Sequence, residues 1–95
     1  MTHEELKTYI ADMGYDSVTI FESPGYDDAF IGIDSNQRAV YDYELMVECL
    51  MREDGMSYDD AVDFIEYNTM RALPYWGDSA PVVVYSLIPD EGEEK

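Results

Sequence analysis

The excess of acidic over basic side chains is the feature that most restricts what this chain can fold into. Its 95 residues include 22 Asp and Glu against 5 Lys and Arg, so the formal net charge is −17 at pH 7. Repulsion on this scale destabilises a compact state. Acidic chains that stay disordered lack aromatic and branched residues, whereas 46% of these residues are hydrophobic and 9 are tyrosines. We therefore expect one small folded domain with a modest core.

The same charge restricts the partners that the protein can bind. Its field attracts cations and basic surfaces, and it repels the nucleic-acid backbone and anionic membranes. We expect a basic protein partner, no direct binding of nucleic acid and no membrane contact. The N-terminal residues lack the pattern of a signal peptide, and the single cysteine, Cys49, has no internal disulfide partner. The sequence thus predicts a cytoplasmic protein in which Cys49 is buried and inert.

Capping residues predict three helices. The first spans residues 3–13, where a Thr2 and Glu5 capping box precedes apolar residues at helical spacing. The second follows Asp42 and ends at Gly55, and the third runs from Ser57 to about residue 73, where Pro74 stops it.

Runs of branched and aromatic residues predict four strands, over residues 17–21, 29–33, 38–41 and 81–87. Residues 34–37 (DSNQ) form the turn of a hairpin between the second and third strands. The order is α-β-β-β-α-α-β, and we expect an α+β fold with an antiparallel sheet and helices packed on one face. The domain is expected to cover residues 1–88, with an acidic solvated tail over residues 89–95.

Acidic side chains concentrate on the second and third helices. Residues 42–66 contain nine carboxylates and one base, Arg52. Asp59, Asp63 and Glu66 fall at helical spacings that align them on one face, about 6 Å apart. Glu44 and Glu48 form a similar row on the preceding helix. These rows resemble the regular charges of a nucleic-acid strand.

Two interpretations of the acidic rows are open. They are either solvated helix faces that keep the protein soluble, or a surface that occupies a groove built for DNA or RNA. Solubility alone requires a net charge of about 2 to 8 in a small domain, which is well below the observed −17. In the second interpretation, tyrosines offer flat contacts beside the charge: Tyr26, Tyr43, Tyr58 and Tyr67.

A second candidate contact lies where the third helix ends. Arg71, Tyr75 and Trp76 belong to the residue types that most often dominate protein interfaces. Alternatively, Arg71 bonds carbonyls at the helix end while Trp76 covers the core.

Signatures of catalysis and metal binding are weak. His3 is the only histidine and is expected to be exposed at a helix start, which argues against a zinc site or a catalytic triad. The acidic segments do not fit a calcium-binding loop. We expect a non-enzymatic protein without a cofactor.

Four strings within residues 39–85 carry a resemblance: 40–43 (VYDY), 53–58 (EDGMSY), 64–69 (FIEYNT) and 71–75 (RALPY). They resemble a family of small acidic proteins of unknown function from Firmicutes and their phages, which implies a bacterial host cell and no assigned activity. In size and charge, the chain is also similar to phage-encoded inhibitors of host defence, including anti-CRISPR and anti-restriction proteins that mimic DNA.

The preferred hypothesis is an inhibitor or nucleic-acid mimic that occupies the basic channel of a partner protein, such as a nucleic-acid-binding enzyme. The alternative is a small structural or regulatory interaction module whose charge serves solubility. An enzyme or a calcium-binding protein is the third hypothesis.

Overall fold

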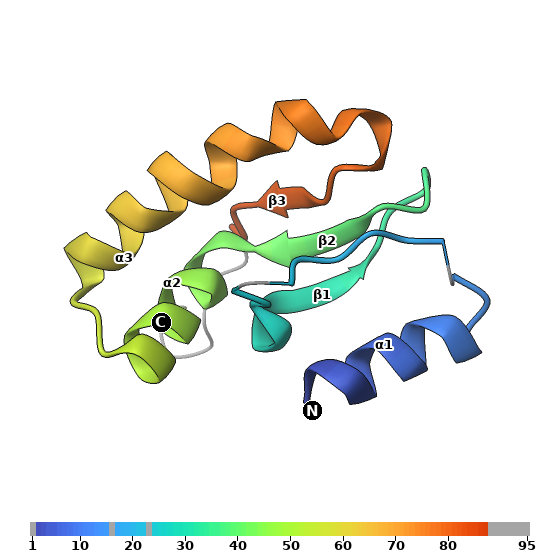
Figure 1. The fold of residues 1–95 in the computed structure, drawn as a ribbon, viewed down its shortest axis with the longest axis horizontal. Coiled ribbons are helices and arrows are strands. Elements are labelled where there is room, and N and C mark those ends of the chain that lie inside the picture. The colour runs from blue at the N-terminus through green and yellow to red at the C-terminus, as the bar shows by residue number, and fades with distance from the viewer. Residues whose placement is uncertain (1, 16, 23, 88–95) are drawn as a thin grey trace.

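Helices surround a short sheet in the computed structural model of this chain, which describes residues 2–15, 17–22 and 24–87 (Figure 1). The predicted α+β class is confirmed. The elements follow one another as α1 (His3–Asp12), β1 (Phe30–Ile33), β2 (Ala39–Asp42), α2 (Tyr43–Asp54), α3 (Tyr58–Phe64) and β3 (Val82–Val84). A 3₁₀ turn over Asp27–Ala29, a π-helical segment over Ile65–Met70 and a 3₁₀ stretch over Leu73–Ser79 complete the helical structure.

The sheet has the order β1-β2-β3 and is mixed. β1 and β2 pair antiparallel as the predicted hairpin, but β3 pairs parallel with β2, so the expectation of a purely antiparallel sheet was wrong. The chain returns from β2 to β3 through the helices, and a long crossover of this kind is what parallel pairing requires.

The hairpin turn is held by the side chain of Asp34. Its Oδ1 accepts hydrogen bonds of 2.9 Å from the backbone N–H groups of Asn36 and Arg38, as expected of a turn rich in such residues. The register shifts between Phe30 and Gly32, which leaves Ile31 as the extra residue of a β-bulge.

Residues 17–21 do not form the predicted strand among the described residues. Ile20 and Phe21 are both buried, although they are consecutive, so the alternation that a half-buried strand needs is broken. The backbone N–H of Phe21 donates to the Tyr41 hydroxyl at 3.1 Å rather than to a neighbouring strand. The segment is therefore an extended connection anchored by a side chain.

All three predicted N-caps are present. Thr2 and Glu5 form a reciprocal capping box on α1, while the side chains of Asp42 and Ser57 accept from the third residue of α2 and α3. Gly55 ends α2 with a φ of 70°, a left-handed conformation that glycine adopts without strain.

The third helix ends near Leu73, as predicted, and a separate 3₁₀ stretch follows it. At Ile65 its backbone widens into the π-helical segment, where the Asn68 side-chain amide donates to the Phe64 carbonyl at 3.2 Å. Pro74 lies in the first turn of the following 3₁₀ stretch, where a missing N–H is tolerated. It therefore lies at the start of this stretch, which reaches Ser79 with a non-helical kink at Gly77 (φ 67°, ψ −143°).

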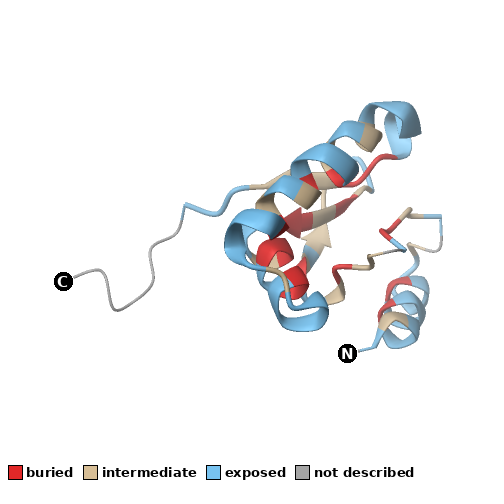
Figure 2. Ribbon diagram, turned by 60° about the vertical axis from the view of Figure 1, so that its left-hand side comes forward, coloured by how far each residue is buried: buried red, intermediate tan, exposed pale blue. Residues whose placement is uncertain are grey.

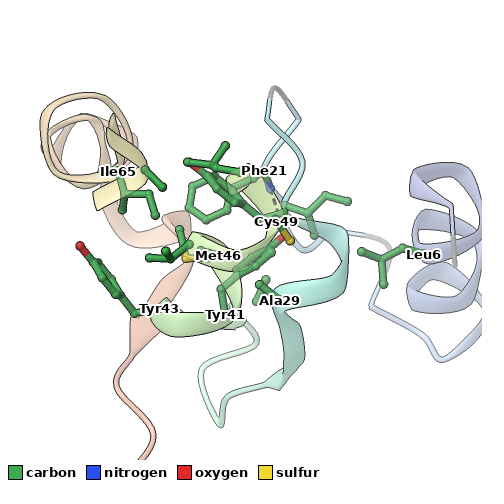
Figure 3. Packing of buried hydrophobic residues seen from close by; sticks show 14 of the residues in the cluster. Leu6, Phe21, Ala29, Tyr41, Tyr43, Met46, Cys49 and Ile65 are labelled. Carbon is green, nitrogen blue, oxygen red and sulfur yellow. Dashed lines mark hydrogen bonds between the residues drawn. The ribbon is translucent and has the colours of Figure 1, made fainter. Parts of the chain in front are cut away.

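The core lies between the sheet and the helices, whose outer faces are exposed (Figure 2). Tyr41 of β2 is fully buried, and its ring contacts those of Phe21 and Phe30. Figure 3 shows Met46 of α2 beside it, with Ile65 on the π-helical segment and Leu6 on α1. The fully buried Ala39 and Tyr41 share the helix-covered face of β2, while Val40 points the other way and is half-buried. The expected tail, residues 89–95, lies outside the described residues.

Candidate binding surface

The predicted acidic rows are exposed on the helices that were expected to carry them. Glu44 and Glu48 lie on α2, and Asp59 and Asp63 lie on α3. Glu66 follows in the π-helical segment, so its position relative to Asp63 is not that of a regular α-helix. We call these five exposed residues the acidic face.

Two tyrosine hydroxyls join the rows of the acidic face. Tyr43 Oη donates to Glu66 Oε2 at 2.8 Å, and Tyr58 Oη donates to Glu44 Oε2 at 3.2 Å. Each tyrosine is the first residue of its helix and reaches a carboxylate on the other helical segment. No local sequence pattern indicates these bonds, because each joins residues that are far apart along the chain.

Both tyrosines are held in the protonated, donating form. Burial, followed by the hydrogen bond to Glu66, raises the pKa of the Tyr43 hydroxyl well above its usual range. The bond to Glu44 raises the pKa of the Tyr58 hydroxyl. The two carboxylates therefore keep neutral donors at physiological pH, and these bonds leave their negative charge in place.

Basic side chains of the described residues form no ion pair with the acidic face. Arg52 pairs with Asp28 at 2.8 Å and with Glu53 at 3.4 Å. Arg71 places its guanidinium carbon 5.7 Å from the centre of the Tyr67 ring. The negative charge of the acidic face is thus left for solvent cations or for a partner.

The expectation of four flat aromatic contacts was wrong for two of the tyrosines. Tyr26 and Tyr43 are buried, because their rings belong to the core. Tyr26 adopts a left-handed conformation and its hydroxyl bonds Thr69 Oγ1 at 2.7 Å, which ties the loop before β1 to the π-helical segment. Tyr58 and Tyr67 are exposed.

The alternative anchor does not converge into one cluster. Tyr75 is 88% exposed, while Trp76 is 38% exposed and its ring lies 5.7 Å from that of the buried Phe21. Arg71 stacks on Tyr67. Of the three residues, Trp76 covers the core as one sequence interpretation expected.

His3 is less exposed than predicted, because two carboxylates hold it. Its side chain is 25% exposed, and its ring nitrogens lie 2.6 Å from Asp27 Oδ1 and 2.8 Å from Glu22 Oε1. A neutral imidazole has one N–H, whereas two carboxylates both require donors, so the geometry favours the imidazolium. The hydrogen bond to Asp27, opposed by burial and reinforced by Glu22, raises the pKa of His3. This cluster fastens the start of α1 to the segment before β1.

Stability is expected to fall as the pH rises from 5.5 to 8.5. Because folding raises the pKa of His3, the stabilisation is complete below the ordinary value of about 6.5. It is lost as the pH rises through the folded pKa. Glu22 is 62% exposed, so we discount its bond and expect a loss of about 1 kcal/mol. Thermal melts across this range measure the effect.

His3→Gln is the matched control, because glutamine retains one donor but does not titrate in this range. Its melting temperature should change much less between the two pH values. An equally steep pH dependence in this variant would assign the effect to another group.

Other chemical sites are weakly represented. Cys49 is buried as predicted, and burial raises the pKa of its thiol. Within residues 2–15, 17–22 and 24–87, no three His, Cys, Asp or Glu side chains are arranged to hold a metal ion. No helix in this part of the chain is long and apolar enough to cross a membrane.

Comparisons of the chain with protein-family models, curated proteins and solved structures gave no match.

Proposed function

We propose that this chain is a non-enzymatic binding protein whose acidic face occupies a basic, nucleic-acid-binding surface of a partner protein. The observation that carries the proposal is the set of five exposed carboxylates on α2, α3 and the π-helical segment, without a basic partner among the described residues. Adjacent like charges destabilise the fold by repelling one another. A basic partner would relieve this repulsion and attract the carboxylates.

The arrangement suits competition with nucleic acid. A channel that binds DNA or RNA presents Lys and Arg to phosphates, and the acidic face presents five exposed carboxylates. The hydrogen bonds from Tyr43 and Tyr58 orient Glu66 and Glu44, which reduces the side-chain entropy lost on binding. The protein would then act as an inhibitor or nucleic-acid mimic.

The experiment is capture by immobilised linker histone, a lysine-rich DNA-binding protein used as the probe. We expect the triple variant Glu48→Lys, Asp59→Lys and Asp63→Lys to bind at least about tenfold more weakly, since each exposed ion pair contributes about 0.5 kcal/mol. The variant leaves Glu44 and Glu66 with their tyrosines. Binding of the natural sequence should weaken as NaCl concentration rises.

The control changes the net charge equally at other positions. Glu4→Lys, Asp12→Lys and Asp78→Lys replace exposed carboxylates on α1 and the 3₁₀ stretch. This control should lose much less affinity than the acidic-face variant. Equal losses would show that the probe responds to total charge, and the proposed role of the acidic face would be rejected.

The exposed Tyr75 beside Trp76 favours a second candidate function, a small structural or regulatory interaction module whose charge serves solubility. In that case Trp76→Ala weakens partner binding, while the triple lysine variant changes it little.

A further inference from the structure

Three neighbouring hollows that share lining residues lie on the surface, and none of them is lined by a residue of the acidic face. The first, of about 530 Å³, is bordered by α1, by the residues before β1 and by Trp76. The second, of about 440 Å³, shares Trp76 and Glu22 with the first and extends to Phe64 on α3. The third, of about 360 Å³, shares Pro24, Tyr26 and Phe64 with the second and reaches the C-terminal end of α2. We call these three adjoining hollows the trough.

The middle of the trough is apolar. Phe21, Pro24, Phe64 and Ala72 line the second hollow, and Ile10, Val18 and Ile20 line the first. In Figure 3, Phe21 lies between the helix that carries Ile65 and the one that carries Leu6. Trp76 stands at the junction of the two hollows and is 38% exposed. A ligand that covered its indole would gain the free energy of apolar burial.

Charge differs between the two ends of the trough. Glu53 and Asp54 line the third hollow at the end of α2, where the helix dipole is also negative. Arg52 is shared between Asp28 and Glu53, and no described base forms an ion pair with Asp54. The one basic side chain that lines the trough among the described residues is Lys7, in the first hollow. Glu22 lines the first hollow beside Lys7, so the charges of these two side chains balance there. The trough therefore favours cations at the Glu53 end.

We propose that the trough binds a peptide segment of a partner protein in which bulky apolar side chains are followed by Lys or Arg. The apolar side chains cover Trp76 and fill the first two hollows, and the basic ones meet Glu53 and Asp54. A second copy of this chain fits poorly, because each copy carries a net charge of −17. The proposal does not rest on the acidic face, since none of its five residues lines the trough.

The fluorescence of Trp76, the single tryptophan of the chain, tests this proposal directly. The probes are synthetic peptides of equal length: leucines followed by lysines, serines followed by lysines, and leucines followed by glutamates. Only the leucine–lysine peptide should shift the Trp76 emission to the blue with saturation, since only it buries the indole and matches the charge. An unchanged emission with this peptide would overturn the proposal. An emission that shifts with protein concentration alone would do the same, by assigning the trough to a second copy.

Two variants test whether the peptide binds in the trough. Ala72→Tyr fills the second hollow, and Glu53→Gln with Asp54→Asn neutralises the charged end; each should weaken the leucine–lysine peptide about tenfold. The double substitution keeps the test decisive if Ala72→Tyr fails to fold, and Ala72→Ser should bind normally.

The matched control, Asp59→Asn with Asp63→Asn, removes the same charge from the acidic face and should change affinity by less than about twofold. If the control lost as much peptide affinity as the trough variant, the peptide would be responding to total charge, and the proposal would be overturned. Because linker-histone capture is measured separately, the proposal for the acidic face and the proposal for the trough can be rejected independently.

Discussion

Replacing Tyr41 with alanine is expected to lower the free energy of unfolding by about 3 to 5 kcal/mol, as for other large buried aromatic side chains. Tyr41 is fully buried, and its ring centre lies 4.7 Å from that of Phe21 and 5.7 Å from that of Phe30. Removing it opens a cavity under the extended connection before β1. A domain of this size has about 5 to 14 kcal/mol in total, so the variant should be close to unfolding at 37 °C. Urea denaturation measures the loss.

Tyr41→Phe separates the contribution of the ring from that of the hydroxyl. It retains the ring contacts but leaves the buried Phe21 N–H without its acceptor, which costs about 1 to 3 kcal/mol. We expect an intermediate stability. A phenylalanine variant as unstable as the alanine variant would show that the hydroxyl, and not ring packing, holds residues 17–21 in place.

Raising NaCl from about 0.01 M to about 0.15 M is expected to stabilise the protein by about 2 kcal/mol, because the Debye length falls from about 30 Å to about 8 Å. At the lower salt concentration the Debye length exceeds the radius of gyration of 13.9 Å, so carboxylates on different elements repel one another. The stabilisation corresponds to a rise in melting temperature of about 8 to 16 °C. Calorimetry over a salt series measures it.

The shape of the salt dependence identifies its cause. Screening predicts most of the increase below about 0.15 M NaCl, whereas exclusion of salt from the surface would add stability steadily at higher concentrations. The triple lysine variant of the acidic face has less net charge and should show a smaller increase. A salt response of the same size in this variant would place the repulsion elsewhere on the surface.

The sequence predicts local structure well here because the caps depend on neighbouring residues. Asp42 and Ser57 each bond a backbone N–H three residues ahead, and this geometry needs no tertiary contact. Residues 17–21 show the opposite case. Their pattern is typical of a strand, but Phe21 finds its acceptor in a side chain twenty positions along the chain. The direction of β3 likewise depends on the path of two helices.

The sequence also predicts part of the candidate binding surface. Carboxylates at helical spacing are expected to be exposed, because an unpaired buried charge is too costly. The tyrosine bonds to Glu44 and Glu66 depend on how the helices cross, which no local pattern specifies. Burial of Tyr43 was missed because its position at a helix start indicates exposure, whereas its ring packs 4.9 Å from that of Tyr85.

The parallel pairing of β3 also determines when the fold can be completed during synthesis. The β1–β2 hairpin is local and can form while the chain is still short, but one edge of β2 waits until Val82–Val84 leave the ribosome. Until then, the growing chain exposes an unpaired strand edge. Its dense negative charge would keep neighbouring nascent chains apart during that interval.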